Sequence, residues 1–235
     1  SLIMVGCWSG VYFGIKNFQM LQKEKQNALK ASTMAHQAHI KMLRYQLNPH
    51  FLFNTLNAIS TLILLKENDT AEAMVSKLSN FLRYSLDNDP IKRVPLGQEI
   101  KVLRLYLEIE KVRFDDRLEV VWDIDPKCES ALVPSMILQP IIENAIKHAI
   151  SRMENGGQIA VTASTFGNDL LMDVADNGPG ADIKDGQLSR KNGVGLVNIK
   201  ERLQSLYQRN FAFSIEHNQP SGVRVRIRIP YDVKD

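Results

Sequence analysis

Residues with the capacity for chemistry occur first in the stretch LNPHFLFNTLN, Leu47 to Asn57. Counted forward from His50, the polar residues Asn54, Asn57 and Thr61 recur at helical spacing, so they share one helical face with the imidazole. The proline directly before the histidine, if it lies inside a continuous helix, removes a backbone hydrogen bond at a cost of about 3 kcal/mol. An isolated helix histidine is usually structural. This one lies on a narrow polar stripe of an amphipathic helix, beside a proline distortion.

A second polar group lies on the amphipathic stretch Pro134 to Ile150. Asn144, Lys147 and His148 are spaced three and four residues apart and therefore share one helical face. An amide oxygen, an ammonium and an imidazole could together meet a polyphosphate and its Mg²⁺. Alone this is a weak signal, because amphipathic helices ordinarily carry such residues on their solvated side.

Two glycine-rich segments follow. DNGPG, Asp176 to Gly180, ends a strand pattern, and NGVGLVN, Asn192 to Asn198, opens a helix pattern. Asn-Gly and Pro-Gly are common turn dipeptides, but glycines at a helix start also let backbone amides approach phosphate oxygens. The polar segment between them, Ala181 to Lys191, is predicted to cover a bound anion. Neither GxxxxGK[ST] nor GxGxxG is present, which excludes a P-loop and a dinucleotide fingerprint.

The helical elements that position the histidine form a hairpin. We expect an opening helix around His50, a loop from Lys66 to Thr70, and a second helix that stops at the DNDP sequence, Asp87 to Pro90. A third helix is predicted from Leu96 to Arg113. The hairpin has an uncovered apolar face, which favours dimerisation into a four-helix bundle. The apolar rows expected to meet a partner are Leu52, Leu56, Ile59, Ile63, Leu78, Phe81 and Leu82.

From Leu118 onward the pattern changes to α/β. The predicted strands are LEVVWDI, QIAVTASTF, DLLMDVAD, FAFSIEH and VRVRIRI, and the predicted helices are Pro134 to Arg152 and Val194 to Gln208. In the last strand, valines and isoleucines alternate with Arg224, Arg226 and Arg228, so one sheet face is buried and the other solvated. A mixed sheet with helices on one face is a two-layer α/β sandwich.

The N-terminal residues are uncharged from Leu2 to Ile15. This stretch is shorter than the roughly 20 apolar residues of a spanning helix, so we interpret it as the end of a transmembrane helix, with a buried core helix as the alternative. Lys16, Lys23 and Lys25 follow, which by the positive-inside rule places the rest in the cytoplasm. The 235 residues carry a net charge of only +3 and two distant cysteines, which disfavours a nucleic-acid binder and a cysteine metal site.

These motifs together resemble a known family. An asparagine helix, D-x-G-x-G after a strand, a polar lid and G-x-G opening a helix are similar to the GHKL ATPases. The segments QLNPHFLFNTLN, FLRYSL and YLEIEKVRF narrow the resemblance to LytS-like sensor histidine kinases, over about Leu43 to Pro230. Together with the pattern of the N-terminal residues, this resemblance gives an expected α+β chain in five parts: 1–15, end of a transmembrane helix; 16–42, connector or coiled-coil helix; 43–90, dimerisation and phosphotransfer hairpin; 91–113, linker helix; 114–235, GHKL ATP-binding domain.

The resemblance also assigns roles to residues. It implies that His50 is the phosphoacceptor, that Asn144 holds Mg²⁺ and that Asp176 receives the adenine amino group of ATP. The expected nucleotide-binding set is Asn144, Lys147, His148, Asp176, Gly178, Gly180, Gly193, Gly195, Leu196 and Gly222.

Two positions depart from the family pattern. Many histidine kinases carry an acidic residue after the histidine, whereas this chain has Phe51, so the base for His50 stays open. Glu143 is a candidate, and Asn54 could orient the ring but takes no proton at neutral pH. A common Gly-Thr pair is Gly222-Val223 here, which puts one water-mediated adenine contact in doubt.

The resulting expectation is a membrane-bound, homodimeric sensor kinase of the bacterial cytoplasmic membrane, with its catalytic part in the cytoplasm. It would phosphorylate His50 from Mg-ATP and pass the phosphoryl group to an aspartate of a response regulator receiver domain. A LytTR-type DNA-binding output on that regulator is one option, and no direct nucleic-acid contact is expected. An ATP-driven conformational switch without phosphotransfer is the alternative from another class. A membrane-tethered coiled coil would leave the glycine motifs unexplained.

Overall fold

The computed structural model describes residue 14 and residues 16–17, 20–26, 48–87, 92–184, 187–188 and 194–233. The chain divides into two compact units, Ser1–Pro49 and His50–Asp235. All of the expected membrane segment 1–15 except residue 14, and most of the connector 16–42, lie outside the described residues. Within the described ranges, no helix is both long enough and apolar enough to cross a membrane.

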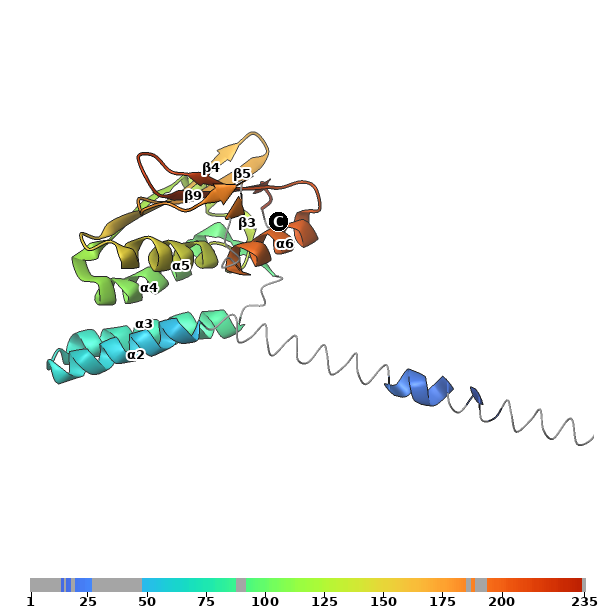
Figure 1. Ribbon diagram of the computed structural model, residues 1–235, viewed down its shortest axis with the longest axis horizontal. Coiled ribbons are helices and arrows are strands. Elements are labelled where there is room, and N and C mark those ends of the chain that lie inside the picture. Colours follow the sequence, from blue (N-terminus) through green and yellow to red (C-terminus); the bar gives the residue numbers. More distant parts are fainter. Residues whose placement is uncertain are drawn as a thin grey trace, which may run out of the picture. The chain divides into compact units, whose positions relative to one another are not determined.

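The second unit opens with a helical hairpin of α2 (Pro49–Leu64) and α3 (Asn68–Asp87) (Figure 1). Asn48 is not helical, so Pro49 is the first residue of α2. A proline at a first helical position sacrifices no hydrogen bond and has a suitable φ. The expectation of a distorting proline inside a continuous helix is therefore wrong for the stretch from Asn48 onward.

The third helix, α4 (Leu96–Phe114), is buried on more than one side. Phe51 of α2 lies 4.7 Å from Tyr106 of α4 and 5.4 Å from Phe81 of α3, measured between ring centroids. Lys77 of α3 also pairs with Glu108 of α4 at 2.7 Å. The helix expected as a linker is thus a packing layer, and an aromatic cluster joins it to the hairpin.

This packing corrects part of the expected dimer face. Ile59, Leu78 and Phe81 are buried within the chain's own core, whereas Leu56 and Ile63 are 50% and 54% exposed. Leu52 and Leu82 are partly buried against the same core. Three of the residues expected to await a partner are therefore already covered by neighbouring elements, mainly because α4 packs on the hairpin.

A five-stranded mixed sheet forms the rest of the unit, with helices α4, α5 and α6 on one of its faces (Figure 1). The strand order is β2-β4-β5-β9-β8; β2 and β4 are parallel and the other neighbours antiparallel. The predicted α+β architecture with a mixed sheet is confirmed. The sheet strands are β2 (Leu118–Ile124), β4 (Gly157–Phe166), β5 (Asp169–Asp176), β8 (Ala212–His217) and β9 (Val223–Pro230), and the helices are α5 (Gln139–His148) and α6 (Val194–Tyr207).

Shorter elements complete the fold. Two small antiparallel pairs join β1 (Arg93–Pro95) to β3 (Leu132–Pro134) and β6 (Ile183–Lys184) to β7 (Gln187–Leu188). Single 3₁₀ turns span Asp115–Arg117, Pro126–Cys128 and Ile150–Arg152. Inward residues of alternate sheet positions form the core beneath the helices: Ile159, Val161, Leu170, Met172, Ile227 and Ile229.

Helix α5 starts later than the sequence pattern predicts. Pro134 ends β3, and Met136 has a positive φ of 59°, so the helix begins only at Gln139. The buried carboxylate of Glu99, on α4, accepts hydrogen bonds from the amides of Met136 (2.7 Å) and Leu138 (3.2 Å). A side chain distant in sequence therefore serves the free amides that precede this helix.

Candidate functional site

A cavity of about 370 Å³ lies between α5, the ends of β5 and β9, and the start of α6. Its volume falls in the range of small-molecule sites, and its floor is mostly apolar. Five residues of the expected nucleotide set line it: Asn144, His148, Asp176, Gly180 and Leu196. The remaining lining residues are Ile141, Ala145, Ala149, Arg152, Val174, Pro179, Ala181, Asp182, Val223 and Val225.

Asp176 is the buried acid of this cavity, with 8% of its surface exposed. Its Oδ1 accepts hydrogen bonds from the amide of Gly178 at 2.9 Å and from the amide of Val223 at 3.2 Å. Burial raises the pKa of this carboxyl above its ordinary value, and the two amide bonds offset part of that rise. Both described hydrogen bonds go to one oxygen, so the second oxygen can accept from a ligand.

Two glycines let the backbone close around Asp176. Gly222 has φ 107°, and a side chain there would overlap the carbonyl group of Asp176. A side chain at Gly178 would overlap Ala149, the residue that follows α5. These two residues shape the cavity from behind rather than lining it, and only glycine permits so close an approach.

The helix α5 presents its polar residues unequally. Asn144 and His148 line the cavity, whereas Lys147 is exposed and does not. The pKa of His148 is lowered by burial and by the positive charges of Lys147 and Arg152, which favours the neutral form of its imidazole. Arg152, unlike Lys147, brings a cationic side chain to the cavity wall. Sequence reasoning missed it, although its position four residues after His148 places it on the same side of the chain.

The start of α6 also reaches the cavity. Leu196 is buried in its wall, and Gly195 lies against α5, since a Cβ on it would stand 3.9 Å from Asn144 Nδ2 and 3.3 Å from Pro140. Gly193 lies outside the described residues. The predicted meeting of the asparagine helix with the second glycine segment is therefore present in the described part of that segment.

His50 lies elsewhere, on the exposed side of α2. Its Nδ1 is 3.1 Å from Nδ2 of Asn54, one helical turn on. Phe51 points the other way and is 4% exposed, packed between Phe81 and Tyr106. The position after the histidine thus serves to fasten the hairpin to α4, which accounts for an aromatic residue there.

Glu143 is half-buried beside Asn144 but does not line the cavity. Its carboxylate accepts a hydrogen bond from Gln139 Nε2 at 2.8 Å. Its negative charge, after the larger effect of burial, helps raise the pKa of Tyr106, a residue of α4. The side chain therefore lies toward α4 in this structure.

The cavity wall offers an oxygen ligand of the kind that a magnesium-bound nucleotide requires. Mg²⁺ prefers hard oxygen ligands and usually takes only one or two from the protein, with phosphate oxygens and waters completing its shell. The amide oxygen of Asn144 at the cavity wall is such a ligand. The residues present fit a Mg²⁺-nucleotide held mainly through its own phosphates.

Known proteins match both parts of the chain. Residues 38–118 match the family model for histidine kinases, and residues 132–233 match the model for histidine kinase-, DNA gyrase B- and HSP90-like ATPases, which implies ATP binding. The sensor histidine kinase BtsS of Escherichia coli K12 is 35% identical over 89% of this chain and 36% of its own length.

Two further sensor proteins are similar to this chain to the same degree. The sensor histidine kinase YpdA of E. coli K12 is 34% identical over 83% of this chain and 35% of its own length. The sensor protein LytS of Staphylococcus saprophyticus is 34% identical over 93% and 38%. The chain spans little more than a third of these relatives. It belongs to the LytS-like sensor histidine kinases, with one region that matches the histidine kinase model and a second that matches the histidine kinase-, DNA gyrase B- and HSP90-like ATPase model.

Proposed function

We propose that this chain is the kinase part of a membrane-bound sensor, which phosphorylates His50 from Mg-ATP and passes the phosphoryl group to an aspartate of a response regulator. The observation that carries the proposal is one cavity in which Asn144, Asp176 and Leu196 converge, in the same chain as an exposed histidine on α2. Family membership supports the same reading.

The adenine would lie on the apolar floor of the cavity. Valines of β5 and β9, together with Ile141, line the cavity with apolar side chains that suit an aromatic base. The oxygen of Asp176 that receives no amide bond would accept from the adenine amino group. Hydrogen bonds to charged groups are worth about 1.5 to 3 kcal/mol, enough to select a base with a donor at that position.

The phosphates would lie toward Asn144 and the glycines that open α6. Asn144 would hold Mg²⁺ through its amide oxygen, and the ion, when bound, neutralises charge on the phosphates. Gly193 and Gly195 would let backbone amides approach the phosphate oxygens, and Lys147, His148 and Gly180 would complete the surroundings. Arg152 is an added candidate for this positive wall.

In the transfer step a nitrogen of the His50 imidazole attacks the γ-phosphorus. The N–P bond forms as the bond from phosphorus to the β–γ bridging oxygen breaks, and that oxygen leaves with the electron pair as part of ADP. Asn54 Nδ2 lies 3.1 Å from Nδ1 and 3.5 Å from Nε2, so Asn54 would hold the ring in place, and the attacking nitrogen is the one that carries no proton. The ring proton goes to a base, for which Glu143 remains the candidate, provided that its side chain leaves Gln139.

The remaining parts of the proposal concern the whole protein. The chain would act as a homodimer, anchored by a helix that ends near residue 15, with its kinase part in the cytoplasm of a bacterium. The partner would be a receiver domain, with a LytTR-type output as one option. Support comes from the names of the relatives, which are sensor histidine kinases and a sensor protein.

Incubation with γ-labelled ATP and Mg²⁺ tests the activity. We expect label on the wild-type chain that is lost in acid, as a phosphohistidine requires, and no label on His50→Gln. Nucleotide binding of His50→Gln, measured by calorimetry, should match wild type because His50 does not line the cavity. Equal labelling of both chains would show another acceptor. Binding and hydrolysis of ATP without any label would favour the alternative, a conformational switch.

A further inference from the structure

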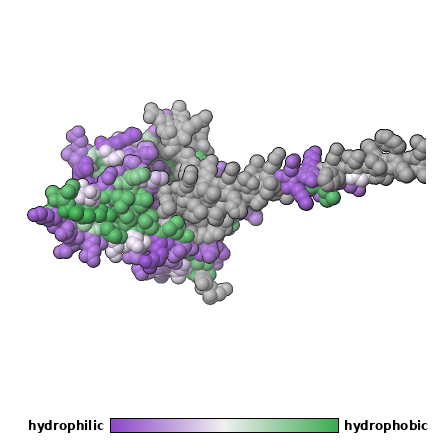
Figure 2. All heavy atoms as spheres, turned by 90° about the horizontal axis from the view of Figure 1, so that it is seen from below, coloured by the Kyte–Doolittle hydropathy of each residue, from purple (hydrophilic) through white to green (hydrophobic). Residues whose placement is uncertain are grey.

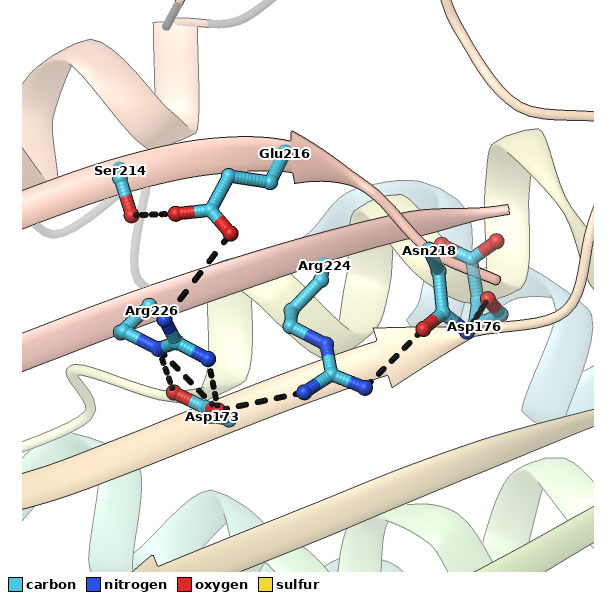
Figure 3. Close-up of polar contacts among 7 residues, drawn as sticks. All are labelled: Asp173, Asp176, Ser214, Glu216, Asn218, Arg224 and Arg226. Atoms are coloured by element: carbon cyan, nitrogen blue, oxygen red, sulfur yellow. Dashed lines mark hydrogen bonds and ion pairs between the residues drawn. The ribbon is translucent and has the colours of Figure 1, made fainter. Parts of the chain in front are cut away.

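The outer face of the sheet carries a continuous chain of polar contacts that ends at Asp176 (Figure 3). Arg226 Nε and Nη2 hold the carboxylate of Asp173 at 3.0 and 3.1 Å. Arg224 Nη1 approaches the same carboxylate at 3.7 Å, and Arg224 Nη2 donates to Oδ1 of Asn218 at 3.1 Å. Asn218 Nδ2 donates to the main-chain oxygen of Asp176 at 2.8 Å.

The orientation of the Asn218 amide is fixed by chemistry. The main-chain oxygen of Asp176 can only accept, so the NH₂ group must face it. The guanidinium of Arg224 can only donate, so the amide oxygen must face that side. Turning the amide over would break both bonds at once. Arg224 therefore determines which end of Asn218 meets Asp176.

The turn between β8 and β9 grips Asp176 at two points. Asn218 holds its main-chain oxygen, and the amide of Val223 holds Oδ1 of its side chain at 3.2 Å. The main-chain N–H of Asn218 also donates to the main-chain oxygen of Gly222 at 3.0 Å, which closes the turn. A shift of this turn would move the backbone and the carboxylate of Asp176 together.

We infer that Asn218 and Arg224 are positioning residues for the recognition of adenine, acting through Asp176 from the face of the sheet opposite the helices. The inference rests on the proposed role of Asp176. Neither residue lines the cavity, so neither touches the nucleotide. Their part is to hold the acceptor oxygen where the amino group of adenine can reach it.

Calorimetric titration of the whole chain with two nucleotides, each with Mg²⁺, tests this. The first is ATP, and the second is purine riboside triphosphate, which keeps the ring and phosphates but lacks the 6-amino group. Asn218→Ala removes the bond to Asp176, and Arg224→Met removes the group that orients the amide. We expect each variant to weaken ATP binding about 3- to 10-fold, the scale of one hydrogen bond. The affinity for the deamino nucleotide should stay within about twofold of the wild-type value. This nucleotide has no 6-amino group to meet Asp176, so it gains nothing from the correct placement of that residue.

The control is Arg228→Met. Arg228 lies on the same strand and face and pairs with Asp169 at the other end of β5, away from Asn218 and Asp176. It should leave the affinity for both nucleotides unchanged. Asn218→Asp is a second, nearly isosteric variant; it keeps the bond to Arg224 but cannot donate to Asp176, and should behave like Asn218→Ala.

Two results would overturn the inference. Unchanged ATP affinity in the Asn218 and Arg224 variants would show that Asp176 needs no such support. Equal weakening of both nucleotides would show a general structural role. Failure of the underlying function looks different, because Asp176→Asn would then keep the preference of wild type for ATP over the deamino nucleotide.

Discussion

Phe51 fills a packing role at the position directly after the histidine, where many other histidine kinases carry an acidic residue. Its ring fills the space between α3 and α4, and His50 before it stays exposed. Neighbouring residues on a helix point about 100° apart, so a buried Phe51 helps direct the imidazole outward. Phe51→Glu would bury a charge in this aromatic cluster and should destabilise the hairpin rather than supply a base.

At Asp176 the structure makes ATP affinity depend on pH. Burial raises the pKa of this carboxyl, and only the ionised form offers both oxygens as acceptors. On acidification we expect ATP affinity to fall at a higher pH than titration of an ordinary exposed aspartate would cause. Calorimetry of wild type and Asp176→Asn across the acidic range measures it. The variant should bind ATP about tenfold or more weakly near neutral pH and lack this pH dependence.

Asn144 allows the metal to be separated from the base. Asn144→Ala should lose the increase in ATP affinity that Mg²⁺ gives, because the amide oxygen is the proposed ligand on α5. Titrations with and without Mg²⁺ give this difference directly. Preference for ATP over the deamino nucleotide should persist, since Asp176 is untouched. A magnesium effect equal to that of wild type would remove Asn144 from the metal site.

At the scale of elements, alternation of apolar and polar residues was a good guide to the sheet. DLLMDVAD corresponds to β5 and LEVVWDI to β2 without any change of boundary. The short strands β1 and β3 were missed, because three residues are too few to show alternation. The start of α5 was also missed, since the residues before it look helical and only Glu99, about forty positions away, shows where their amides are held.

The same limit applies to the site. Motif spacing predicted that Asn144, Asp176 and Gly195 lie near one another; the structure has Asn144 and Asp176 in the wall of one cavity and Gly195 beside Asn144. It could not show that Lys147 points to solvent or that Asn218 supports Asp176. The contact of Asn218 with Asp176 depends on the register between strands β8 and β9, and that register is decided by how the two strands pair in the folded chain.

Because Glu99 is buried and holds the amides that precede α5, we expect the stability of the chain to depend on pH. Burial raises its pKa from 4.5 to about 7, so the folded chain binds this proton more tightly than the unfolded chain. Between those values, the free energy of unfolding should fall as pH rises, by about 3 kcal/mol in total from this group. Glu99→Gln should lack this component. Urea unfolding at pH 5 and pH 8 measures the difference between the two chains, and parallel pH curves would contradict the assignment.

At the scale of the whole molecule, part of the hairpin's apolar surface remains exposed in the described part of the chain (Figure 2). The exposed apolar residues of α2 and α3 are Phe53, Leu56, Ile63, Leu64, Val75 and Leu86. Each gains roughly 1.5 to 3 kcal/mol on full burial, which is large beside a typical domain stability of about 5 to 15 kcal/mol. We therefore keep the proposal of a dimer on this surface, which includes Leu56 and Ile63 of the expected rows but not the buried Ile59, Leu78 and Phe81.

A chain starting at Lys16 should be dimeric in light scattering, and Leu56→Asp with Ile63→Asp should make it monomeric. Phe81 is unsuitable for this test because it is 2% exposed, so a charge there would unfold the hairpin. Phe166→Asp is the matched control, since Phe166 is 73% exposed at the end of β4, outside the hairpin. A folded dimer that survives the double substitution would exclude this surface.

The dimer surface bears on which ATP reaches which histidine. Phe51 and Ile59 turn toward the chain's own core, whereas His50 lies on the exposed side of α2, as do Phe53 and Leu56. A partner on that surface would lie on the same side of α2 as His50, so we expect transfer between subunits. Mixed dimers of a His50→Gln chain and an Asn144→Ala chain, distinguishable by size, test it with γ-labelled ATP. Label should appear on the Asn144→Ala chain, which keeps the acceptor but lacks the metal ligand. Verified mixed dimers that remain unlabelled would mean transfer within one subunit.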